Sequence, residues 1–212
     1  MRKTKFAFKG TWKVFLVLLF CAVEMGFGYA QTEPWMDELQ TKREETDKEF
    51  SNPETSILPE SEVESFKGLH YFDIKSEYRV KAKFKRIKNG TEFKMKTTTT
   101  RLPVYKPYGV ISFKLNGAKY RLTVYQNIEL SKKEGYEDYL FLPFTDLTNG
   151  ETTYGGGRYI DLKMGDLKKL IIDFNAAYNP YCAYNSKFSC PIPPSENHLE
   201  IAIEAGVQKY HD

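Results

Sequence analysis

From residue 69 onward, apolar and polar residues alternate along much of the chain with a period of two. The clearest run is Tyr78–Lys85, in which Tyr, Val, Ala and Phe alternate with Arg and Lys. This is the period of a half-buried β-strand. Asn-Gly pairs occur at residues 89–90 and 116–117, and Asn-Gly between alternating runs is the strongest short-range hairpin signal. We therefore expect antiparallel strands joined by tight turns.

Two-residue turns at the Asn-Gly pairs fix the expected registers of two hairpins. The apolar partners are Phe113 with Tyr120, Ile111 with Leu122, and Phe84 with Met95, while Val80 faces Thr99. The same registers place three pairs of lysines directly opposite each other: Lys85 with Lys94, Lys83 with Lys96, and Lys114 with Lys119. Like charges in these positions are destabilising. We expect acidic neighbours to offset them, and an anionic partner such as a lipid headgroup or an acidic glycan is the alternative.

Further strand candidates are residues 139–144, 158–162, 169–174 and 198–204. Strands do not alternate with long helices, which excludes a doubly wound parallel fold. The pattern predicts a mainly β fold, with an antiparallel sheet curled into a barrel or a sandwich.

One helix is expected ahead of the sheet, over residues 33–50. Pro34 suits a first turn, Asn52-Pro53 ends the segment, and sparse apolar positions among many charges make the helix amphipathic. We assign residues 31–65 to this helix and a connector, and residues 66–212 to a single β-rich domain.

Residues 1–30 have the parts of a secretory signal peptide. A basic segment precedes an apolar run over residues 14–23, and Gly28-Tyr29-Ala30 supplies small residues for cleavage. The run is shorter than the about 20 residues of a transmembrane helix, and Glu24 ends it. We therefore expect cleavage after Ala30, a periplasmic or secreted location, and no stable membrane insertion after cleavage. An uncleaved N-terminal anchor is the alternative.

Cleavage changes the net charge and the cysteine count. The chain has 31 basic and 28 acidic residues, and removing the five basic residues and one acidic residue of the signal leaves 26 and 27, a net charge near −1. Nucleic-acid binding thereby loses its main support. Cys182 and Cys190 remain as a pair, for which an exported protein favours a disulfide, with two buried free thiols as the alternative. Their spacing is not that of a zinc site, so we expect no metal.

Chemically distinctive residues concentrate between positions 155 and 197. Three glycines at 155–157 precede a strand-like run rather than a helix, which excludes a dinucleotide-binding loop and favours a tight corner in a barrel. Acids, amides and phenols follow near strand ends, where they suit a small polar ligand such as a sugar. The candidate ligand-binding residues are Arg158, Tyr159, Asp173, Asn175, Tyr178, Asn179, Glu196 and Asn197.

These residues also have structural interpretations. Arg158 can clamp a ligand carboxylate or phosphate, or pair with Asp146 or Asp173. Asp173 can cap the turn after its strand. Asp173 and Glu196 are also candidates for acid–base chemistry on a glycoside. The Gly-x-Ser-x-Gly and His-Glu-x-x-His motifs are absent, and no cofactor is expected.

The segment from Tyr108 to Val207 resembles the DUF1684 family of uncharacterised bacterial proteins. The resemblance rests on residues 153–159 (Thr-Tyr-Gly-Gly-Gly-Arg-Tyr), 173–175 (Asp-Phe-Asn), 177–180 (Ala-Tyr-Asn-Pro), 182–183, 190–191, 193–194, 196–197 and 204–206 (Glu-Ala-Gly). Tyr181 departs from the pattern, because the family usually has a second proline there. The resemblance implies a bacterial origin and a shared site, without naming an activity.

These observations predict an exported protein with a single β-rich domain that serves the bacterial envelope as a binding or structural module. The expected partner is a small polar ligand. The alternative is a hydrolase acting on a glycan or another envelope component.

Overall fold

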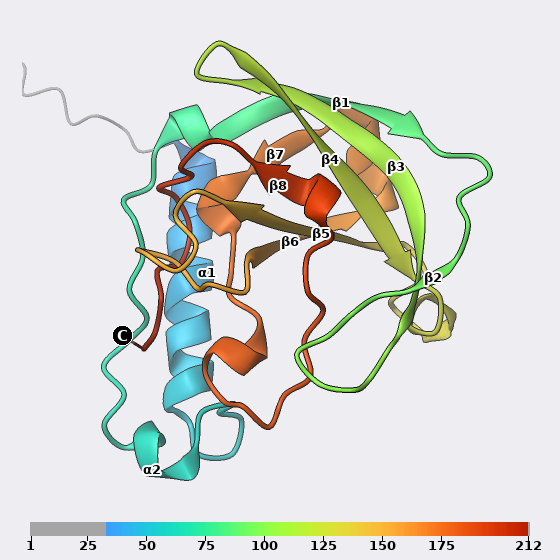
Figure 1. Cartoon of the computed structure of the whole chain (residues 1–212). Helices are drawn as coiled ribbons and strands as arrows, with labels where there is room; N and C mark the ends of the chain where they lie inside the picture. The colour runs from blue at the N-terminus through green and yellow to red at the C-terminus, as the bar shows by residue number, and fades with distance from the viewer. Residues whose placement is uncertain (1–32, 212) are drawn as a thin grey trace, which may run out of the picture. The chain divides into compact units, whose positions relative to one another are not determined.

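Eight β-strands and one long helix form the part of the chain that this computed structural model describes, residues 33–211 (Figure 1). The expected signal peptide, residues 1–30, lies outside the described residues. The strands are β1 (Arg79–Arg86), β2 (Phe93–Lys94), β3 (Val104–Leu115), β4 (Ala118–Asn127), β5 (Tyr139–Asp146), β6 (Arg158–Lys163), β7 (Ile171–Asp173) and β8 (His198–Leu199). The α-helices are α1 (Pro34–Ser51) and α2 (Glu60–Val63), and the short 3₁₀ helices are η1 (Ser76–Tyr78), η2 (Leu130–Lys132), η3 (Met164–Lys169), η4 (Phe174–Ala176), η5 (Tyr181–Ala183) and η6 (Ser195–Asn197).

The strands form one sheet that is nearly closed into a barrel, so the predicted mainly β fold is confirmed. The strand order is β6-β5-β4-β3-β1-β7, with β2 added to β3 and β8 added to β5. All pairs are antiparallel except β5 with β8, which is parallel. The segment after β7 links the two ends of this order, because β7 pairs with β1 while Tyr178 exchanges both backbone hydrogen bonds with Tyr159 of β6, at 2.9 and 3.0 Å.

The barrel interior holds the main hydrophobic core. Alternate residues of each strand point inward, as the period of two requires. The core includes Ile111 and Phe113 of β3, Leu122 and Val124 of β4, Leu140, Leu142 and Phe144 of β5, Ile160 and Leu162 of β6, and Ile172 of β7.

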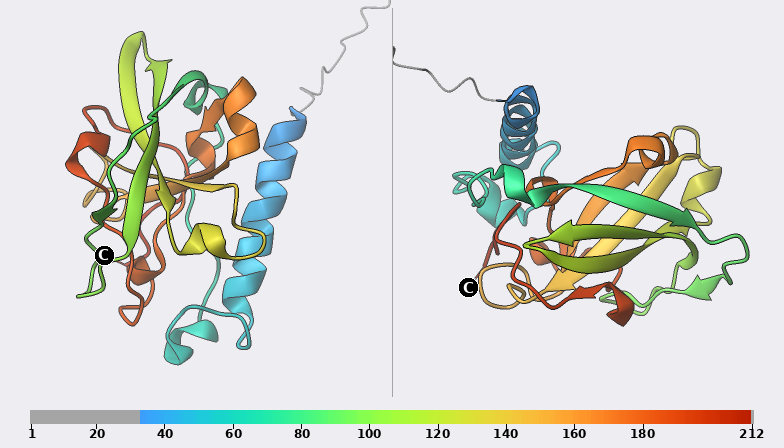
Figure 2. Two further views of the ribbon diagram at one scale, coloured as in Figure 1. Left: turned by 90° about the vertical axis from the view of Figure 1, so that its right-hand side faces the viewer. Right: turned by 90° about the horizontal axis from the view of Figure 1, so that it is seen from above.

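Helix α1 stands beside the barrel and outside it, as the two further views in Figure 2 show. The helix begins at Pro34, next to the predicted start, and runs to Ser51. Its buried residues are Leu39, Arg43 and Phe50. The remainder of the helix is largely exposed, as its charge pattern predicts. No helix within residues 33–211 is long and apolar enough to cross a membrane.

The hairpin at Asn116-Gly117 is confirmed. Strands β3 and β4 pair with Phe113 opposite Tyr120 and Ile111 opposite Leu122. Asn116 has φ 49° and Gly117 has φ 80°. A type I′ turn needs positive φ at both central residues, and Asn-Gly supplies it at low cost.

The predicted hairpin at Asn89-Gly90 is wrong. Neither residue has positive φ, so the chain does not reverse there. Instead, β1 and β2 lie one after the other along the same edge of β3, and Phe84 pairs with Ile111 rather than with Met95. The alternation of apolar and polar residues determines which face of a strand is buried, but it does not determine which strand it pairs with. The twelve-residue strand β3 offers a longer edge than the two-residue strand β2.

This pairing removes two of the three predicted lysine pairs. Lys85 faces Val110 and Lys83 faces Ser112, whereas Lys114 does face Lys119. Lys114 and Lys119 lie at the exposed hairpin end, where solvent screens their repulsion. The case for an anionic partner on this face is correspondingly weaker.

Candidate functional site

Strand β6 has an outer face that points away from the barrel core and carries Tyr159 and Asp161. The residues on either side of Asp161 are core residues, so alternation directs the Asp161 side chain outward. On the neighbouring strand β5, Tyr139 and Phe141 share this face, and Phe141 pairs with Asp161 across the ladder. Tyr178 extends the face because its backbone pairs with Tyr159.

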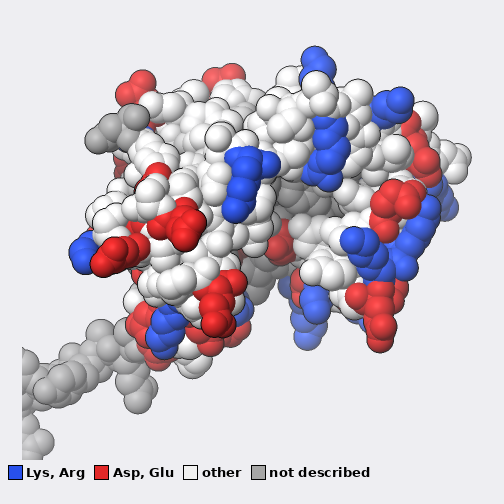
Figure 3. All heavy atoms as spheres, turned by 90° about the horizontal axis from the view of Figure 1, so that it is seen from below, with Lys and Arg blue, Asp and Glu red and all other residues white. Residues whose placement is uncertain are grey.

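A cavity of about 490 Å³ lies over this face. Its walls come from α1, from the outer face of β5 and β6, from residues 175–181, and from residues 190–191. Figure 3 shows a hollow near the centre of one face of the molecule, with acidic atoms visible inside it. The volume falls within the 300–1,000 Å³ of typical small-molecule sites. Seven tyrosines contribute to the lining: Tyr71, Tyr105, Tyr139, Tyr159, Tyr178, Tyr181 and Tyr184.

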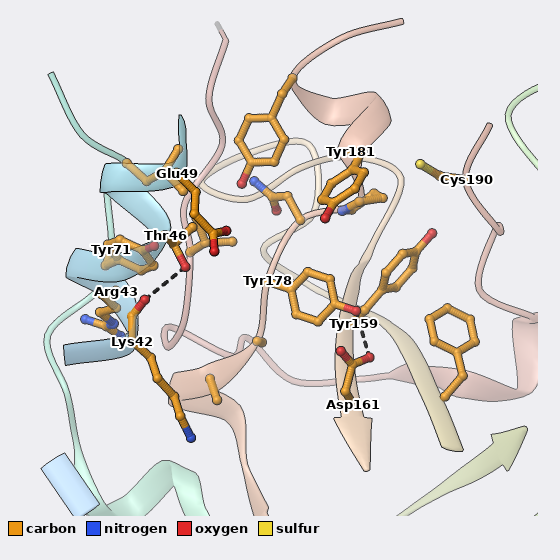
Figure 4. A pocket seen from close by; sticks show the side chains of 18 of the residues that line it. Lys42, Arg43, Thr46, Glu49, Tyr71, Tyr159, Asp161, Tyr178, Tyr181 and Cys190 are labelled. Atoms are coloured by element: carbon orange, nitrogen blue, oxygen red, sulfur yellow. Dashed lines mark hydrogen bonds between the residues drawn. The ribbon is translucent and has the colours of Figure 1, made fainter. Parts of the chain in front are cut away.

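Asp161 supplies a carboxylate to the floor of this cavity (Figure 4). Its Oδ1 accepts hydrogen bonds from the hydroxyls of Tyr139 and Tyr178, both at 2.7 Å. The side chain is open to the cavity solvent although protein surrounds it. Burial raises the pKa of Asp161, and the two phenols only partly offset this effect. Burial and the charge of Asp161 raise the pKa values of Tyr139 and Tyr178, so both phenols stay protonated as donors.

Asn179 brings a buried acceptor without a partner to the cavity wall. The residue is 1% exposed, and its Nδ2 donates to the carbonyl oxygen of Gln208 at 2.9 Å. Its Oδ1 is buried and has no hydrogen-bond partner within residues 33–211. An unpaired buried acceptor costs about 1–3 kcal/mol. Asn179 lines the cavity, and a ligand donor that reached Oδ1 would remove this cost.

The two basic residues of the wall are engaged elsewhere. The ammonium of Lys42 lies 2.7 Å from Glu38 Oε1. The guanidinium of Arg43 donates to the carbonyl oxygens of Phe72 and Asn175, both at 3.1 Å, and stacks over Tyr71 at 4.4 Å. In Figure 4 the guanidinium of Arg43 lies on the α1 side, away from Asp161.

Cys182 and Cys190 are adjacent free cysteines in this structure, so the predicted disulfide is not formed here. The backbone N–H of Cys182 donates to Cys190 Sγ at 3.2 Å, and Cys190 lines the cavity. Hydrogen bonding from the Cys190 thiol lowers the pKa of Cys182 to about 6. Cys182 is therefore the thiol that ionises first.

Four of the eight predicted ligand-binding residues line the cavity: Tyr159, Asn175, Tyr178 and Asn179. The other four, Arg158, Asp173, Glu196 and Asn197, do not. The structure therefore brings four of the eight candidate residues to one cavity.

Arg158 lies inside the protein with 0% exposure and joins the barrel to the C-terminal segment. Its Nη2 donates to Asp146 Oδ2 and to the carbonyl oxygen of Ile203, both at 2.8 Å, and its Nη1 donates to the carbonyl oxygen of Ala205. All these partners belong to the protein. The structural alternative therefore describes Arg158 better than ligand binding does. Gly157 before it has φ +87°, which makes the glycine run the predicted tight corner.

Asp173 and Asn175 form a separate structural cluster. Asp173 Oδ1 accepts from the backbone N–H of Asn175 at 3.0 Å and so caps η4. Asp173 Oδ2 lies 3.5 Å from Arg79 Nε. The side chain of Asn175 holds both the N–H and the carbonyl oxygen of Lys75, at 3.0 and 2.9 Å. Asp173 is thus the turn cap that the sequence allowed.

Asn197 fills a gap between β4 and β5, which form one backbone pair at Tyr125 and Phe141. Its side chain accepts from Thr123 N at 2.7 Å and donates to the carbonyl oxygens of Thr123 and Pro143, at 2.8 and 2.6 Å. Glu196 beside it accepts from the hydroxyl of Tyr125 at 2.8 Å. These residues have different partners from Asp173, and neither Asp173 nor Glu196 lines the cavity over β6.

Sequence reasoning missed the wall from α1 and the central role of Asp161. A usable signal existed for Asp161, because it lies two residues after Tyr159 in an alternating strand and therefore shares its face. No comparable signal existed for Lys42, Arg43 and Glu49, because their place over the sheet depends on tertiary packing of α1.

Comparisons with known proteins agree with the fold and add no activity. The family model of DUF1684, described as a protein of unknown function, matches residues 64–208. A solution NMR structure of an uncharacterized protein from Haloarcula marismortui is similar, with 37% sequence identity, a TM-score of 0.63, and coverage of 82% of this chain and 94% of that chain. That organism is an archaeon, so the comparison does not support the predicted bacterial origin. A search of curated proteins finds no match. On the family match, which spans more than half of its length, this chain belongs to the DUF1684 family.

Proposed function

We propose that this protein binds a small, partly polar ligand in the cavity between α1 and β6. The observation that carries the proposal is Asn179, a residue that lines a preformed cavity and whose buried Oδ1 lacks a partner within residues 33–211. The apolar parts of the tyrosine rings supply contact area. Asp161 and Asn179 supply the few fixed polar groups that orient a ligand in such sites.

We also propose that the protein works outside the cytoplasm, in the periplasm or as a secreted protein of the cell envelope. The support is the signal-like composition of residues 1–30. The helices and strands described begin at Pro34, so cleavage after Ala30 would remove none of them. In that oxidising environment the adjacent thiols of Cys182 and Cys190 would form the predicted disulfide.

A hydrolase acting on a glycan is the second candidate function, and the geometry gives it little support. Its suggested acid and base, Asp173 and Glu196, hold separate structural contacts and neither lines the cavity. General acid–base catalysis needs both groups within reach of one substrate. The geometry therefore favours binding over this form of catalysis.

The test is a fragment screen by ligand-observed NMR with a cavity-filling variant. Ala176 is exposed and lines the cavity, so Ala176→Trp should block the space with little effect on folding. Ala118→Trp makes the same change at an exposed position on β4 outside the lining. Fragments should bind the parent protein and Ala118→Trp and lose binding to Ala176→Trp. Equal binding to both variants would contradict the proposal.

A further inference from the structure

The charge inside the cavity is unbalanced. Asp161 has two phenol donors on Oδ1, and neither an ion pair nor a partner for Oδ2 occurs within the described residues. Burial alone raises its pKa, and no cation is near enough to contribute to lowering it. The Asp161 side chain keeps contact with the solvent of the cavity, so a cation in solution can reach its carboxylate. Here the protein supplies none.

A second carboxylate faces the same space. Glu49 of α1 lines the cavity, and Figure 4 shows its carboxylate pointing inward, toward the side of Tyr178 and Tyr181. It too has no ion pair among residues 33–211. Burial raises the pKa of Tyr181, and the charges of Glu49 and then Asp161 raise it further. Both acids therefore place negative potential at Tyr181, on the cavity wall.

The polar atoms of the lining residues that lack a hydrogen-bond partner favour hydrogen-bond donors on the ligand. Asp161 Oδ2 and Asn179 Oδ1 are both acceptors. Seven tyrosines line the cavity, and the faces of phenol rings are electron-rich and attract ammonium groups. The described residues form no cluster of three or more His, Cys, Asp or Glu that could hold a metal ion. An organic cation therefore fits the wall better than a metal ion does.

We propose that the ligand of this cavity is an organic amine, bound as its ammonium form, with the N–H groups on Asp161 and Asn179 and the carbon skeleton against the tyrosine rings. This inference rests on the binding function proposed above and narrows its ligand class. Glu49 adds attraction at the α1 side. Lys42 is paired with Glu38, and neither Lys42 nor Arg43 contributes to the pKa of Asp161, so their charges act weakly at this carboxylate.

A series of three compounds that share a phenylethyl group and differ in charge tests the inference. Isothermal titration calorimetry would compare 2-phenylethylamine, 2-phenylethanol and 3-phenylpropionate, which carry a positive charge, no charge and a negative charge at neutral pH. The amine should bind about 10- to 100-fold more tightly than the alcohol, as expected for a hydrogen bond to a charged group. The propionate should bind most weakly, because it faces two carboxylates.

Two substitutions assign the effect to Asp161. Asp161→Asn should weaken amine binding about 10- to 100-fold and leave alcohol binding unchanged. Asp37→Asn is the control, because it also removes one negative charge, at an exposed position on α1 outside the cavity lining. It should change none of the three affinities by more than about twofold, because solvent screens such a charge.

The outcomes separate this inference from the proposed function. Alcohol or propionate binding as tight as amine binding, and lost in Ala176→Trp, would overturn the amine and leave the binding function standing. Amine binding that Asp161→Asn leaves intact would overturn the inference as well. Absence of binding by all three compounds, together with no fragment bound in the screen, would overturn both proposals.

Discussion

Replacing Arg158 by Met tests whether this residue is a structural tie rather than a ligand-binding group. Methionine keeps much of the length of the side chain and removes its charge and donors. Asp146 would keep three hydrogen bonds to Oδ1, from Thr148 N at 2.9 Å, Thr148 Oγ1 at 2.6 Å and Ile203 N at 3.1 Å. Its Oδ2 would lose its partner, and the side chains of both residues are 0% exposed.

The expected cost follows from that burial. Removing one partner of a buried ion pair typically destabilises a protein by about 3–5 kcal/mol, because the other charge is left uncompensated. For a domain of about 150–250 residues, each kcal/mol shifts Tm by about 2–4 °C. We therefore expect Arg158→Met to lower Tm by roughly 6–20 °C, measured by circular dichroism, with urea unfolding giving the free energy.

Arg79→Met is the matched control. Arg79 pairs with Asp173 at 3.5 Å, and their side chains are 32% and 22% exposed. A pair open to solvent contributes at most about 1 kcal/mol. A loss below about 1 kcal/mol for Arg158→Met, combined with loss of ligand binding, would refute the structural assignment of Arg158.

Three further predictions concern the turn, the thiols and the cavity acid. Asn116→Ala should lower the free energy of unfolding by about 1–2 kcal/mol because alanine is strained at φ 49°, while Asn89→Ala should be nearly neutral; equal urea midpoints for the two variants would contradict the turn assignments. In the reduced protein, the rate of Cys182 alkylation by iodoacetamide, followed by mass spectrometry, should rise as the pH passes about 6 and then level off, because the pKa of Cys182 is lowered to about 6. An alkylation rate that still rises at pH 9 would count against a thiolate stabilised by Cys190. The folded-state pKa of Asp161 is raised, so its ionised form opposes folding at neutral pH, and Asp161→Asn should keep or increase Tm at pH 7. A decrease of more than about 1 kcal/mol in the free energy of unfolding would show that the fold needs this carboxylate.

The sequence predicted local structure well wherever the cause is local. The alternation of apolar and polar residues located β5 and β6 at the predicted positions, and Asn116-Gly117 fixed a register because both residues tolerate positive φ. The strand predicted over residues 169–174 is shorter in the structure, where it spans Ile171–Asp173 between η3 and η4. The 198–204 prediction gave only His198–Leu199.

Features that depend on tertiary packing escaped the sequence. The same dipeptide at 89–90 forms no type I′ turn, because the edge of β3 takes both flanking strands and keeps the chain running in one direction. The guanidinium of Arg158 is a group that often binds ligands. Its partners here, Asp146 and carbonyls near the C-terminus, come from distant parts of the chain, so the sequence could not identify them. The cavity exists because α1 lies over the outer face of β6, which no local pattern encodes.

Chemical-shift mapping tests the central claim most directly. Titration of 2-phenylethylamine into isotope-labelled protein should shift the signals of Tyr139, Tyr159, Asp161 and Tyr178 first, along with those of residues 46–50 on α1. The shifts should saturate at a common affinity, as binding to one site requires. Signals that move instead on the exposed face of β1, β3 and β4, or that move across the protein without saturating, would contradict a ligand site between α1 and β6.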